Sequence, residues 1–318
     1  MLKLDETLNF HTKKNDLLSI GEILIDLISN EYDANSSSNC YHKHFGGSPS
    51  NIAMNAKKLG IRSVVASAVG QDGSGDFLLK QLQDSGMNTE CIQTADEATS
   101  MVMLTKSQST PTPIFYREAD YQLVYTPKLE HYLNESKILH FSCWPISRSP
   151  ARHTIEKSIE VAKENGLLIC FDPNYHERLW EKGMDGISYI QSIIAKCDIV
   201  KPSEDDAERL FGRDLPERYI EKFLKLGAKL VILTLGKNGA MVSNGSTIET
   251  FSTLATNVVD TTGAGDAFWS GFYAGIVTGY TIRKSIQIGF ATSAYKLQYT
   301  GAVVDLPKLE VLCSIYQI

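Results

Sequence analysis

Short apolar runs alternate with amphipathic helical segments along most of the chain, and this alternation limits the possible folds more than any other feature. The runs have the length of buried strands, and the segments between them have helical spacing of apolar residues. The expected strands are 17–29, 61–70, 138–144, 167–174, 197–203 and 229–236, and the expected helices are 48–60, 75–88, 151–166, 204–212 and 216–228. Strands that are apolar throughout are typical of a parallel sheet with helices on both faces. The order therefore predicts a three-layer α/β/α architecture with a mostly parallel central sheet.

Two features of the sequence depart from this pattern. Gly21 and Glu22 interrupt the first apolar run, which indicates a bulge or a strand edge close to a site. Residues 31–46 and 98–126 are rich in Thr, Tyr and alternating polar residues, which favours antiparallel strands outside the main sheet. Together these segments would form a small β-strand lid, and two ordinary surface hairpins are the alternative. The whole chain, 1–318, is predicted to form a single α/β domain.

The charge balance and the cysteine pattern narrow the classes of partner and compartment. A formal net charge of -6 and a pI of about 5.7 give no general attraction to phosphate backbones or anionic membranes, so no nucleic acid and no membrane is expected as a partner. The six cysteines contain no CxxC pair and are interpreted as reduced, buried small hydrophobes. The sequence has neither the apolar core of a signal peptide nor a run of about 18 apolar residues. A cytoplasmic protein is therefore expected.

The stretch VVDTTGAGDAFWSG, at residues 258–271, places two glycines and an aspartate in one turn before a helix of small residues. Gly263 and Gly265 allow backbone angles that other residues avoid, and they let a ligand approach the amides. The helix that begins near Asp266 adds the positive end of its dipole. The amides of these glycines and of Ala264 are therefore predicted to cradle a phosphate or an oxyanion.

Asp266 is unexpected inside such a cradle, because its carboxylate repels the anion that the amides attract. A general base that accepts a proton from the attacking group explains this position. The alternative is that Asp266 only caps the helix, as aspartate often does. Two other nucleotide-binding devices are missing, since the sequence contains no GxxxxGK[ST] motif and no GxGxxG after the first strand. A dinucleotide-binding dehydrogenase is therefore disfavoured.

Two motifs in the sequence resemble the two signatures of the ribokinase or PfkB family of carbohydrate kinases. These are GGSPSN at 46–51 and DTTGAGDAF at 260–268, and both their order and their separation are similar to the family pattern. The segments GEILID, GQDGSGDFLLKQLQDSGMN, FDPN, KPSEDDAERLFG and TLGKNGA also resemble family elements, so the resemblance covers the chain from Leu17 to about Leu306. It implies a ribokinase-like fold with a lid of extra strands that closes over a sugar.

The resemblance also implies an activity, the ATP-dependent phosphorylation of a sugar hydroxyl. Asp266 would take the proton from the hydroxyl that attacks the γ-phosphate, and the amides of residues 263–265 would hold the charge on the transferring oxygens. Mg²⁺ is expected to bridge the phosphates. By the same analogy, a monovalent cation, usually K⁺, is expected behind the turn near Asp260 and Thr262.

Further site residues follow from the resemblance. For the sugar it points to Asp26, Gly47 and Asn51, whose carboxylate and amide suit hydroxyl groups. Without the motifs, Asp26 would be interpreted as a solvent-facing strand end and Asn51 as an early helix residue without a ligand. The residues that match the family's nucleotide site are Thr234, Gly236 and Gly239, with Lys201 and Ser203 at the preceding strand end.

Two places depart from the family pattern. Ser203 and Asp206 stand where members commonly have an Asn-x-x-Glu pattern that organises hydrated Mg²⁺, and these shorter side chains put the metal geometry in doubt. His176 stands at the arginine position of the Asp-Pro-Asn-x-Arg pattern found in the fructokinase and 2-keto-3-deoxygluconate kinase branches, where Arg178 is a substitute.

The predicted sugar depends on whether arginine is present at the expected positions, because a guanidinium group can bind a carboxylate with two parallel hydrogen bonds. The segments FYREAD, FDPN and LW are similar to the fructokinase and 2-keto-3-deoxygluconate kinase branches, and Arg117 would contact the sugar in either. The missing arginine at position 176 favours a neutral hexose, with fructose as the predicted substrate and 2-keto-3-deoxygluconate as the alternative. A catalytically silent sugar- or nucleotide-binding protein on the same fold is the third hypothesis. Because lids in this family often pair between subunits, a homodimer through the lid is also expected.

Overall fold

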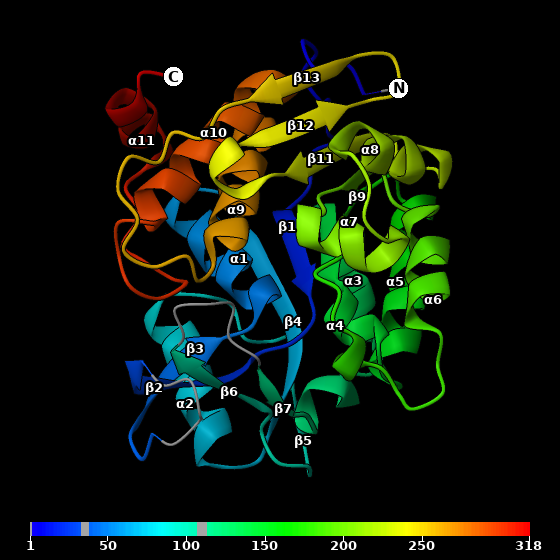
Figure 1. Cartoon of the computed structure of the whole chain (residues 1–318). Helices are drawn as coiled ribbons and strands as arrows, with labels where there is room; N and C mark the ends of the chain where they lie inside the picture. The colour runs from blue at the N-terminus through cyan, green and yellow to red at the C-terminus, as the bar shows by residue number, and fades with distance from the viewer. Residues whose placement is uncertain (1, 33–37, 107–112) are drawn as a thin grey trace.

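The central element of the protein is a nine-stranded sheet, shown by a computed structural model that describes residues 2–32, 38–106 and 113–318 (Figure 1). In spatial order its strands are β13 (Ile248–Phe251), β12 (Ala240–Ser243), β11 (Leu230–Thr234), β10 (Ile199–Val200), β9 (Leu168–Asp172), β8 (Ser136–Ser142), β1 (Asn15–Ile20), β4 (Ser63–Gly70) and β5 (Ile92–Ala95). Every neighbouring pair from β5 to β11 is parallel, whereas β12 and β13 are antiparallel. The predicted mostly parallel sheet is confirmed.

Helices cover both faces of this sheet. One face is covered by α1 (Ser48–Lys58), α2 (Gly73–Asp84), α9 (Ala264–Val277), α10 (Ile282–Lys296) and α11 (Leu309–Tyr316). The other is covered by α3 (Pro127–Asn134), α4 (Cys143–Ile146), α5 (Ala151–Glu164), α6 (Gly186–Ile194), α7 (Glu204–Phe211) and α8 (Pro216–Lys225). Three short 3₁₀ helices complete the described elements, at Ala119–Gln122, Glu177–Leu179 and Gly236–Asn238. The structure is the predicted three-layer α/β/α arrangement.

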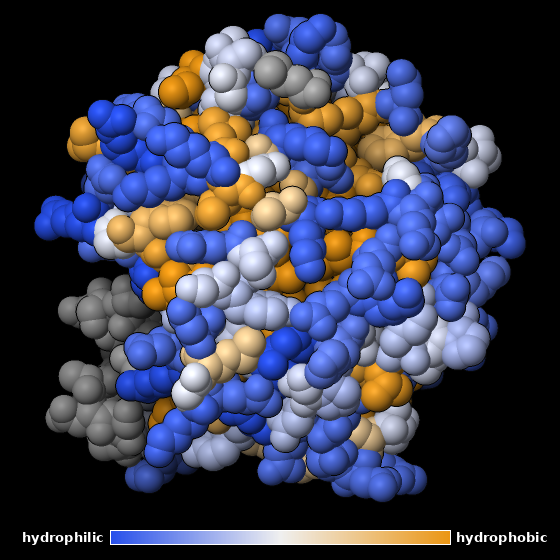
Figure 2. Space-filling view, turned by 90° about the vertical axis from the view of Figure 1, so that its right-hand side faces the viewer, coloured by the Kyte–Doolittle hydropathy of each residue, from blue (hydrophilic) through white to orange (hydrophobic). Residues whose placement is uncertain are grey.

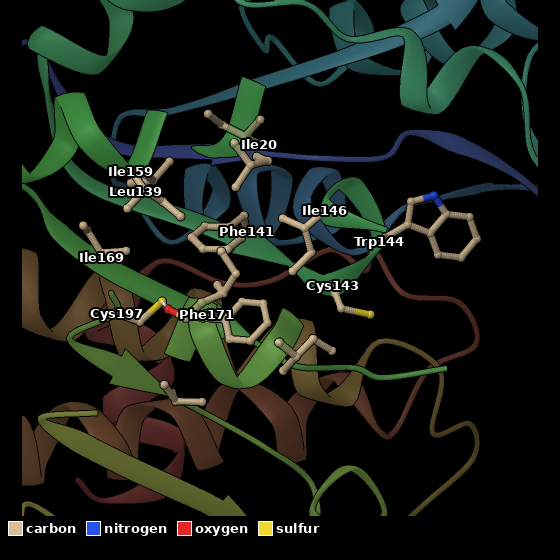
Figure 3. Close-up of a cluster of buried hydrophobic side chains, with 14 of the residues drawn as sticks. Ile20, Leu139, Phe141, Cys143, Trp144, Ile146, Ile159, Ile169, Phe171 and Cys197 are labelled. Atoms are coloured by element: carbon tan, nitrogen blue, oxygen red, sulfur yellow. Dashed lines mark hydrogen bonds between the residues drawn. The ribbon is translucent and has the colours of Figure 1, made fainter. Parts of the chain in front are cut away.

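The strand residues explain the three layers because successive side chains enter opposite cores. In β1, Leu17 packs with α9 and α10, whereas Leu18 and Ile20 pack with the helices of the opposite face. Phe141 and Phe171 belong to this second core, where their rings lie 5.1 Å apart (Figure 3). Because alternate side chains of a strand enter these two cores, a central strand must be apolar on both of its faces.

The outer surface on the side of α5, α6 and α8 is mixed. Figure 2 shows hydrophobic side chains between hydrophilic ones there, mainly in its upper and middle parts.

The helix that follows the glycine turn, α9, packs closely against α10. A Cβ atom at Gly271 would lie 2.7 Å from the Ile288 carbonyl oxygen, and one at Gly275 would lie 2.8 Å from the Cα atom of Ser285. Side chains at these positions would therefore separate the two helices. This packing holds the N-terminus of α9 at a fixed place beside the sheet.

A second, four-stranded sheet lies beside the first, in the lower part of Figure 1. Its spatial order is β3 (Tyr41–Gly46), β2 (Leu24–Tyr32), β6 (Met101–Lys106) and β7 (Ile114–Tyr116). The β2–β3 and β6–β7 pairs are antiparallel as expected, but β2 and β6 are parallel. The parts of the predicted lid segments at 33–37 and 107–112 lie outside the described residues. A role of this sheet as a lid stays a prediction.

Two details of the sequence interpretation are corrected. The run 17–29 is not one strand, because the chain leaves the central sheet after Ile20 and enters the small sheet at Leu24. The break is local: the Glu22 side chain turns inward to accept a hydrogen bond from the Ser48 amide. Cys40 is exposed, whereas the other five cysteines are buried as expected. Among the described helices, none is long and apolar enough to span a bilayer.

Candidate active site

The candidate site lies where the carboxyl ends of β1, β9 and β10 face the N-termini of α1 and α9. In open parallel sheets this edge is where ligands bind, because strand ends and helix N-termini meet there. The glycine turn precedes α9, and the GGSPSN motif forms the start of α1. The fold therefore brings the two motifs together although more than 200 residues separate them, as the Ser48–Asp266 hydrogen bond shows.

Asp266 lies in the first turn of α9, but it does not cap that helix. The N-cap residue is Gly263, and the Asp266 carboxylate instead accepts hydrogen bonds from another helix: Ser48 Oγ donates at 2.6 Å and Asn51 Nδ2 at 2.9 Å. Burial raises the pKa of Asp266, although these two hydrogen bonds oppose the shift. A partly buried, oriented carboxylate with a raised pKa has the properties of a general base.

The turn before Asp266 has the backbone geometry that the sequence predicted. Gly263 has a φ of 70°, in the left-handed region, and a Cβ atom there would lie 2.7 Å from the Cα atom of Ala302. Both observations require glycine at this position. Because α9 begins at Ala264, the amide of Gly265 lies in its first turn and has no carbonyl partner four residues earlier in the helix, whereas the Ala264 amide donates to the Thr261 carbonyl oxygen at 3.2 Å. The turn can therefore present donors to an anion.

The ammonium group of a buried lysine lies next to this turn. The side chain of Lys201 is almost fully buried, its ammonium lies 2.9 Å from an Asp172 carboxylate oxygen, and a Cβ atom at Gly265 would lie 3.5 Å from that ammonium. Trp269 fixes the pair, because its Nε1 donates to the same Asp172 oxygen at 2.8 Å. The sequence placed Lys201 with the nucleotide, and the structure puts its charge beside the anion cradle. Asp172 was quoted in the FDPN segment but given no role.

The predicted sugar-binding residues surround Asp266 from the side of the small sheet. Asp26 lies on β2 opposite His44 of β3, and its carboxylate packs against Gly46. Burial raises the pKa of Asp26 to about 7, and the negative charge of Asp266 contributes to this shift. A Cβ atom at Gly47, where φ is 108°, would clash with the Glu22 carbonyl oxygen. The two carboxylates therefore influence each other electrostatically, and binding of a sugar between them stays a prediction.

Sequence reasoning missed two polar residues of this site, Glu22 and Ser48. Glu22 is buried, and burial raises its pKa to about 8. Its Oε1 accepts the Ser48 amide at 3.1 Å, and its Oε2 has no hydrogen-bond partner among the described residues. Ser48 in turn donates to Asp266. Their positions inside GEILID and GGSPSN were visible, but the spacing of a motif does not show which of its side chains turn inward.

The nucleotide residues gather around a 3₁₀ turn after β11. Gly236 and Gly239 both have positive φ angles, 55° and 84°, and the 3₁₀ turn Gly236–Asn238 lies between β11 and β12. Ser203 pairs with Thr234 in an isolated parallel bridge. The structure therefore brings four of the predicted nucleotide residues to one place at the edge of the sheet, next to β10 and Lys201.

Ser203 and Asp206, which replace the expected metal-organising pair, form a capping box at the start of α7. The Asp206 Oδ2 accepts from the Ser203 amide at 3.0 Å and from Ser203 Oγ at 2.6 Å, and its Oδ1 accepts from the Tyr175 amide at 2.8 Å. Among the described residues there is no cluster of three or more His, Cys, Asp or Glu side chains that suits a metal. Both Asp206 oxygens are already in use within the protein.

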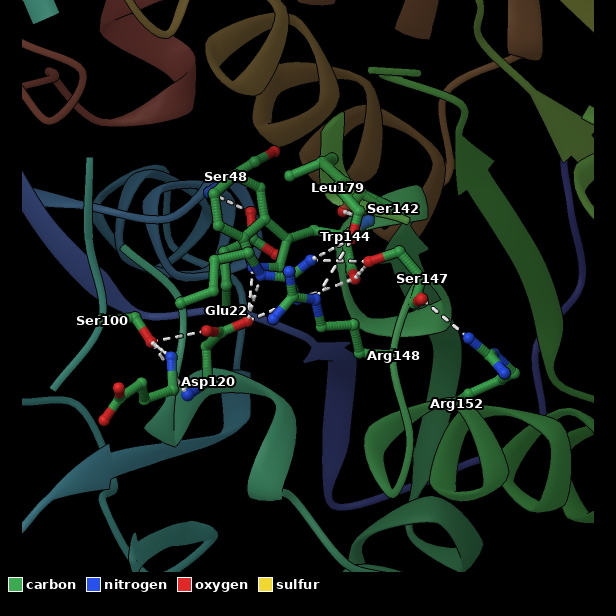
Figure 4. Close-up of polar contacts among 12 residues, drawn as sticks. Glu22, Ser48, Ser100, Asp120, Ser142, Trp144, Ser147, Arg148, Arg152 and Leu179 are labelled. Carbon is green, nitrogen blue, oxygen red and sulfur yellow. Dashed lines mark hydrogen bonds and ion pairs between the residues drawn. The ribbon is translucent and has the colours of Figure 1, made fainter. Parts of the chain in front are cut away.

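Arg117 has its hydrogen-bond partners in a buried cluster that includes Asp120, Trp144 and Ser147, which Figure 4 labels, and it forms no hydrogen bond with Asp266. It forms a buried ion pair with Asp120 at 2.5 Å, and its side chain is 1% exposed. All five N–H groups of its guanidinium find acceptors inside the protein: Asp120 accepts two, and Ser147 Oγ and the carbonyl oxygens of Leu179 and Trp144 accept the others. No donor of Arg117 is left for a sugar, so in this structure Arg117 stabilises its buried partners and does not present a group to a ligand.

Replacing Arg117 with methionine is expected to lower the free energy of unfolding by about 3–5 kcal/mol, because the buried Asp120 charge then loses its partner. Arg218→Met is the control, since Arg218 pairs with Glu221 on the surface and its loss should cost less than about 1 kcal/mol. Chemical denaturation of both variants measures the difference. Equal values would show that the buried network does not stabilise the fold.

Comparison with known proteins agrees with this geometry. The model of the pfkB family carbohydrate kinases matches residues 14–309. An ATP-dependent 6-phosphofructokinase of Thermoanaerobacterium thermosaccharolyticum is 55% identical over 318 residues, which is 100% of this chain and 99% of the relative. The structure of Halothermothrix orenii fructokinase is 42% identical and has a TM-score of 0.78, covering 86% of this chain and 97% of its own.

A more distant structure shows the same fold with a nucleotide bound. It is a ribokinase-type protein from E. coli in complex with ATP and Mg²⁺, with 24% identity, a TM-score of 0.82, and coverage of 95% of this chain and 99% of its own. The family model covers most of the chain, and a 55% identical kinase covers all of it. Together with the motifs that meet at Asp266, these matches show that the chain belongs to the pfkB family of carbohydrate kinases.

Proposed function

We propose that this kinase transfers the γ-phosphoryl group of ATP to a hydroxyl of a fructose-type sugar, with Asp266 as the general base. The observation that supports this most directly is the partly buried Asp266 carboxylate at the N-terminus of α9, oriented by Ser48 and Asn51 and next to the amides of the glycine turn. A base and an anion cradle at the same point are what phosphoryl transfer to a hydroxyl requires.

In the proposed mechanism the carboxylates interact with the sugar hydroxyls, and the backbone N–H groups and Lys201 interact with the phosphoryl oxygens. Asp266 accepts the proton of the attacking hydroxyl through a carboxylate oxygen, so the sugar oxygen becomes nucleophilic as the bond to phosphorus forms. The backbone N–H groups of Gly263, Ala264 and Gly265 and the ammonium of Lys201 face the oxygens of the transferring group, where negative charge is held. Asp26 orients the sugar by accepting hydrogen bonds from its other hydroxyls.

The residues around the 3₁₀ turn suit a nucleotide. Gly236 and Gly239 allow a close approach of the backbone, and Thr234 and Ser203 lie beside them. Mg²⁺, when bound with ATP, neutralises phosphate charge. Since Asp206 already accepts three hydrogen bonds, we infer that this chain holds the metal mainly through phosphate oxygens and water.

Fructose 6-phosphate is the acceptor that we propose first. The 55% identical relative is named for phosphorylating a fructose that already has a phosphate at position 6, and its match spans the whole chain. Fructose itself, the acceptor favoured by the sequence, is the second candidate because the 42% identical neighbour is a fructokinase. A keto acid is disfavoured by the side-chain contacts: Arg117 has no donor free for a carboxylate, and the ring of His176 packs edge-on against Phe115 at 5.0 Å.

The test is a comparison of kcat/KM for fructose 6-phosphate, fructose, 2-keto-3-deoxygluconate and ribose, measured as ADP release from Mg-ATP by the purified chain. We expect kcat/KM for fructose 6-phosphate to exceed that for fructose at least about tenfold, which corresponds to about 1.4 kcal/mol of preferential binding in the transition state. A higher value for fructose would favour the second candidate. A higher value for the keto acid would contradict the role given to Arg117, and no turnover with any sugar would favour a silent binding protein.

A further inference from the structure

A buried lysine lies directly behind the catalytic turn. Lys296 is the last residue of α10 and is fully buried. Its ammonium donates to the Asp260 carbonyl oxygen at 2.7 Å and lies 3.8 Å from an Asp260 carboxylate oxygen. Asp260 is the first residue of the DTTGAGD motif, only three positions before Gly263. The charge of Lys296 is therefore held at the base of the turn that forms the anion cradle.

The Asp260 carboxylate accepts three hydrogen bonds from this chain. One oxygen accepts hydrogen bonds from the Thr262 amide at 2.9 Å and from Thr262 Oγ1 at 2.8 Å, and the other accepts one from the Gly301 amide at 2.8 Å. Burial raises the pKa of Asp260, but the hydrogen bonds from Thr262 and Gly301 and the nearby charge of Lys296 outweigh this and leave it below its usual value. Asp260 is therefore an ionised carboxylate that faces a lysine.

These contacts connect three segments to one another: the turn, the end of α10 and the loop that contains Gly301. The same loop packs against the turn at Ala302, whose Cα atom excludes any side chain at Gly263. The Leu297 carbonyl oxygen also accepts a hydrogen bond from the Val259 amide at 2.8 Å. A change in the charge at Lys296 would therefore alter the position of the cradle itself.

The resemblance to the family led us to expect a monovalent cation near Asp260 and Thr262, and the residues present do not fit one. A cation needs oxygen atoms with free lone pairs and no competing positive charge. Here the Asp260 carbonyl oxygen already accepts an ammonium N–H, and the carboxylate faces the same ammonium. A K⁺ ion placed beside these oxygens would lie next to the positive charge of Lys296, which repels it.

We propose that the ammonium of Lys296 takes the place of the monovalent cation, so that this kinase contains its own fixed charge and works without K⁺. Lys296 is a positioning residue in this account, since it contacts Asp260 rather than the substrate. Burial lowers the pKa of Lys296, the Asp260 carboxylate offsets part of this cost, and the C-terminal end of α10 is a favourable place for a positive charge. The proposal rests on the kinase activity proposed above but not on the identity of the sugar.

The first measurement is the rate of ADP formation by the unmodified protein in K⁺, Na⁺ or tetramethylammonium chloride at equal ionic strength, with saturating Mg-ATP and acceptor. The three rates are expected to agree within about twofold. Activation by K⁺ of about tenfold or more would overturn the proposal. This result does not depend on any variant that could fail to fold.

Two substitutions then distinguish the charge from the volume of the side chain. Lys296→Met keeps the volume but removes the charge, so kcat should fall by up to about 10²-fold in every salt because the cradle is misplaced. Lys296→Ala removes both, and K⁺ should restore part of its kcat because the ion can enter the space. Lys284→Met, on the same helix, should keep the unmodified rate. A Lys296→Met protein with unchanged kcat would overturn the proposal.

A readout without turnover separates this proposal from the proposed function. The thermal unfolding midpoint of the unmodified protein should be the same in K⁺ and tetramethylammonium, whereas that of Lys296→Ala should rise in K⁺, because an ion that binds only the folded state stabilises it. If no sugar is phosphorylated in any salt, the proposed function fails, and the midpoints still decide this inference. A K⁺-dependent midpoint in the unmodified protein would contradict it.

Discussion

Replacing Asp266 with asparagine is expected to lower kcat by about 10²- to 10⁴-fold while sugar binding remains measurable. Asparagine keeps the size of the side chain, but its amide cannot accept the proton that the attacking hydroxyl releases. Its nitrogen would also face one of the two donors, Ser48 Oγ or Asn51 Nδ2, which in the unmodified protein bond to different carboxylate oxygens. Steady-state kinetics give the loss in kcat, and calorimetric titration with the sugar shows whether the site still forms.

The control for this substitution is Asp76→Asn, because Asp76 is also an aspartate in the first turn of a helix, but it is exposed. It should have the unmodified kcat. If Asp266→Asn kept near-normal turnover, the assignment of Asp266 as the base would be wrong. A loss of sugar binding equal to the loss of kcat would show instead that Asp266 mainly holds the substrate.

The same base determines how the reaction depends on pH. Only the ionised carboxylate can accept a proton, so kcat should fall as the pH decreases through the pKa of Asp266. Burial raises that pKa, and the fall should therefore occur at a higher pH than for an exposed aspartate. The pKa of about 7 for Asp26 should add a further decrease in kcat/KM on acidification, because the protonated carboxyl accepts fewer hydrogen bonds from the sugar.

The second large effect is expected for Gly263→Ala, which should lower kcat by about 10²- to 10³-fold, the usual cost of losing an anion-hole donor. The added methyl group would collide with Ala302, and the φ of 70° is unfavourable for alanine. The backbone must therefore rotate, which turns the amides of Ala264 and Gly265 away from the transferring oxygens. Steady-state kinetics at saturating ATP and acceptor measure the loss.

Gly279→Ala is the control for Gly263→Ala, because it introduces the same backbone strain at a position outside the proposed site. Gly279 also has a positive φ, 90°, and a Cβ atom there would meet nothing within 4 Å. This variant should lose some stability, roughly 1 kcal/mol, because alanine avoids that conformation, but it should keep its kcat. If the two alanine variants lost the same fraction of kcat, the position of the amides at residues 263–265 would not be important for catalysis.

Much of the fold could be predicted because the spacing of apolar residues along the chain indicates directly which side chains are buried. The alternation of apolar strands and amphipathic helices predicted the parallel sheet and its covering helices. The division of the first apolar run between two sheets could not be predicted in the same way. Its residues are apolar on both sides of Gly21 and Glu22, so composition does not show that the strands belong to different sheets.

The site could be predicted only as far as its motifs extend. The glycine turn and the GGSPSN segment located Asp266 and Asn51, whose hydrogen bond confirms that the motifs meet. Arg117 was expected at the sugar because arginine suits anions, but Asp120, three residues later, takes its charge in a buried pair. Lys296 belongs to no motif, and its contact with Asp260 exists only in the folded chain.

Phosphorus NMR of the purified protein with Mg-ATP and fructose 6-phosphate tests the central claim most directly, because it observes where the phosphoryl group goes. The account predicts a new sugar phosphate ester that appears in a one-to-one ratio with ADP, and no such product with Asp266→Asn over the same period. ADP that accumulates together with inorganic phosphate, or an ester formed equally fast by the Asp266→Asn variant, would contradict it.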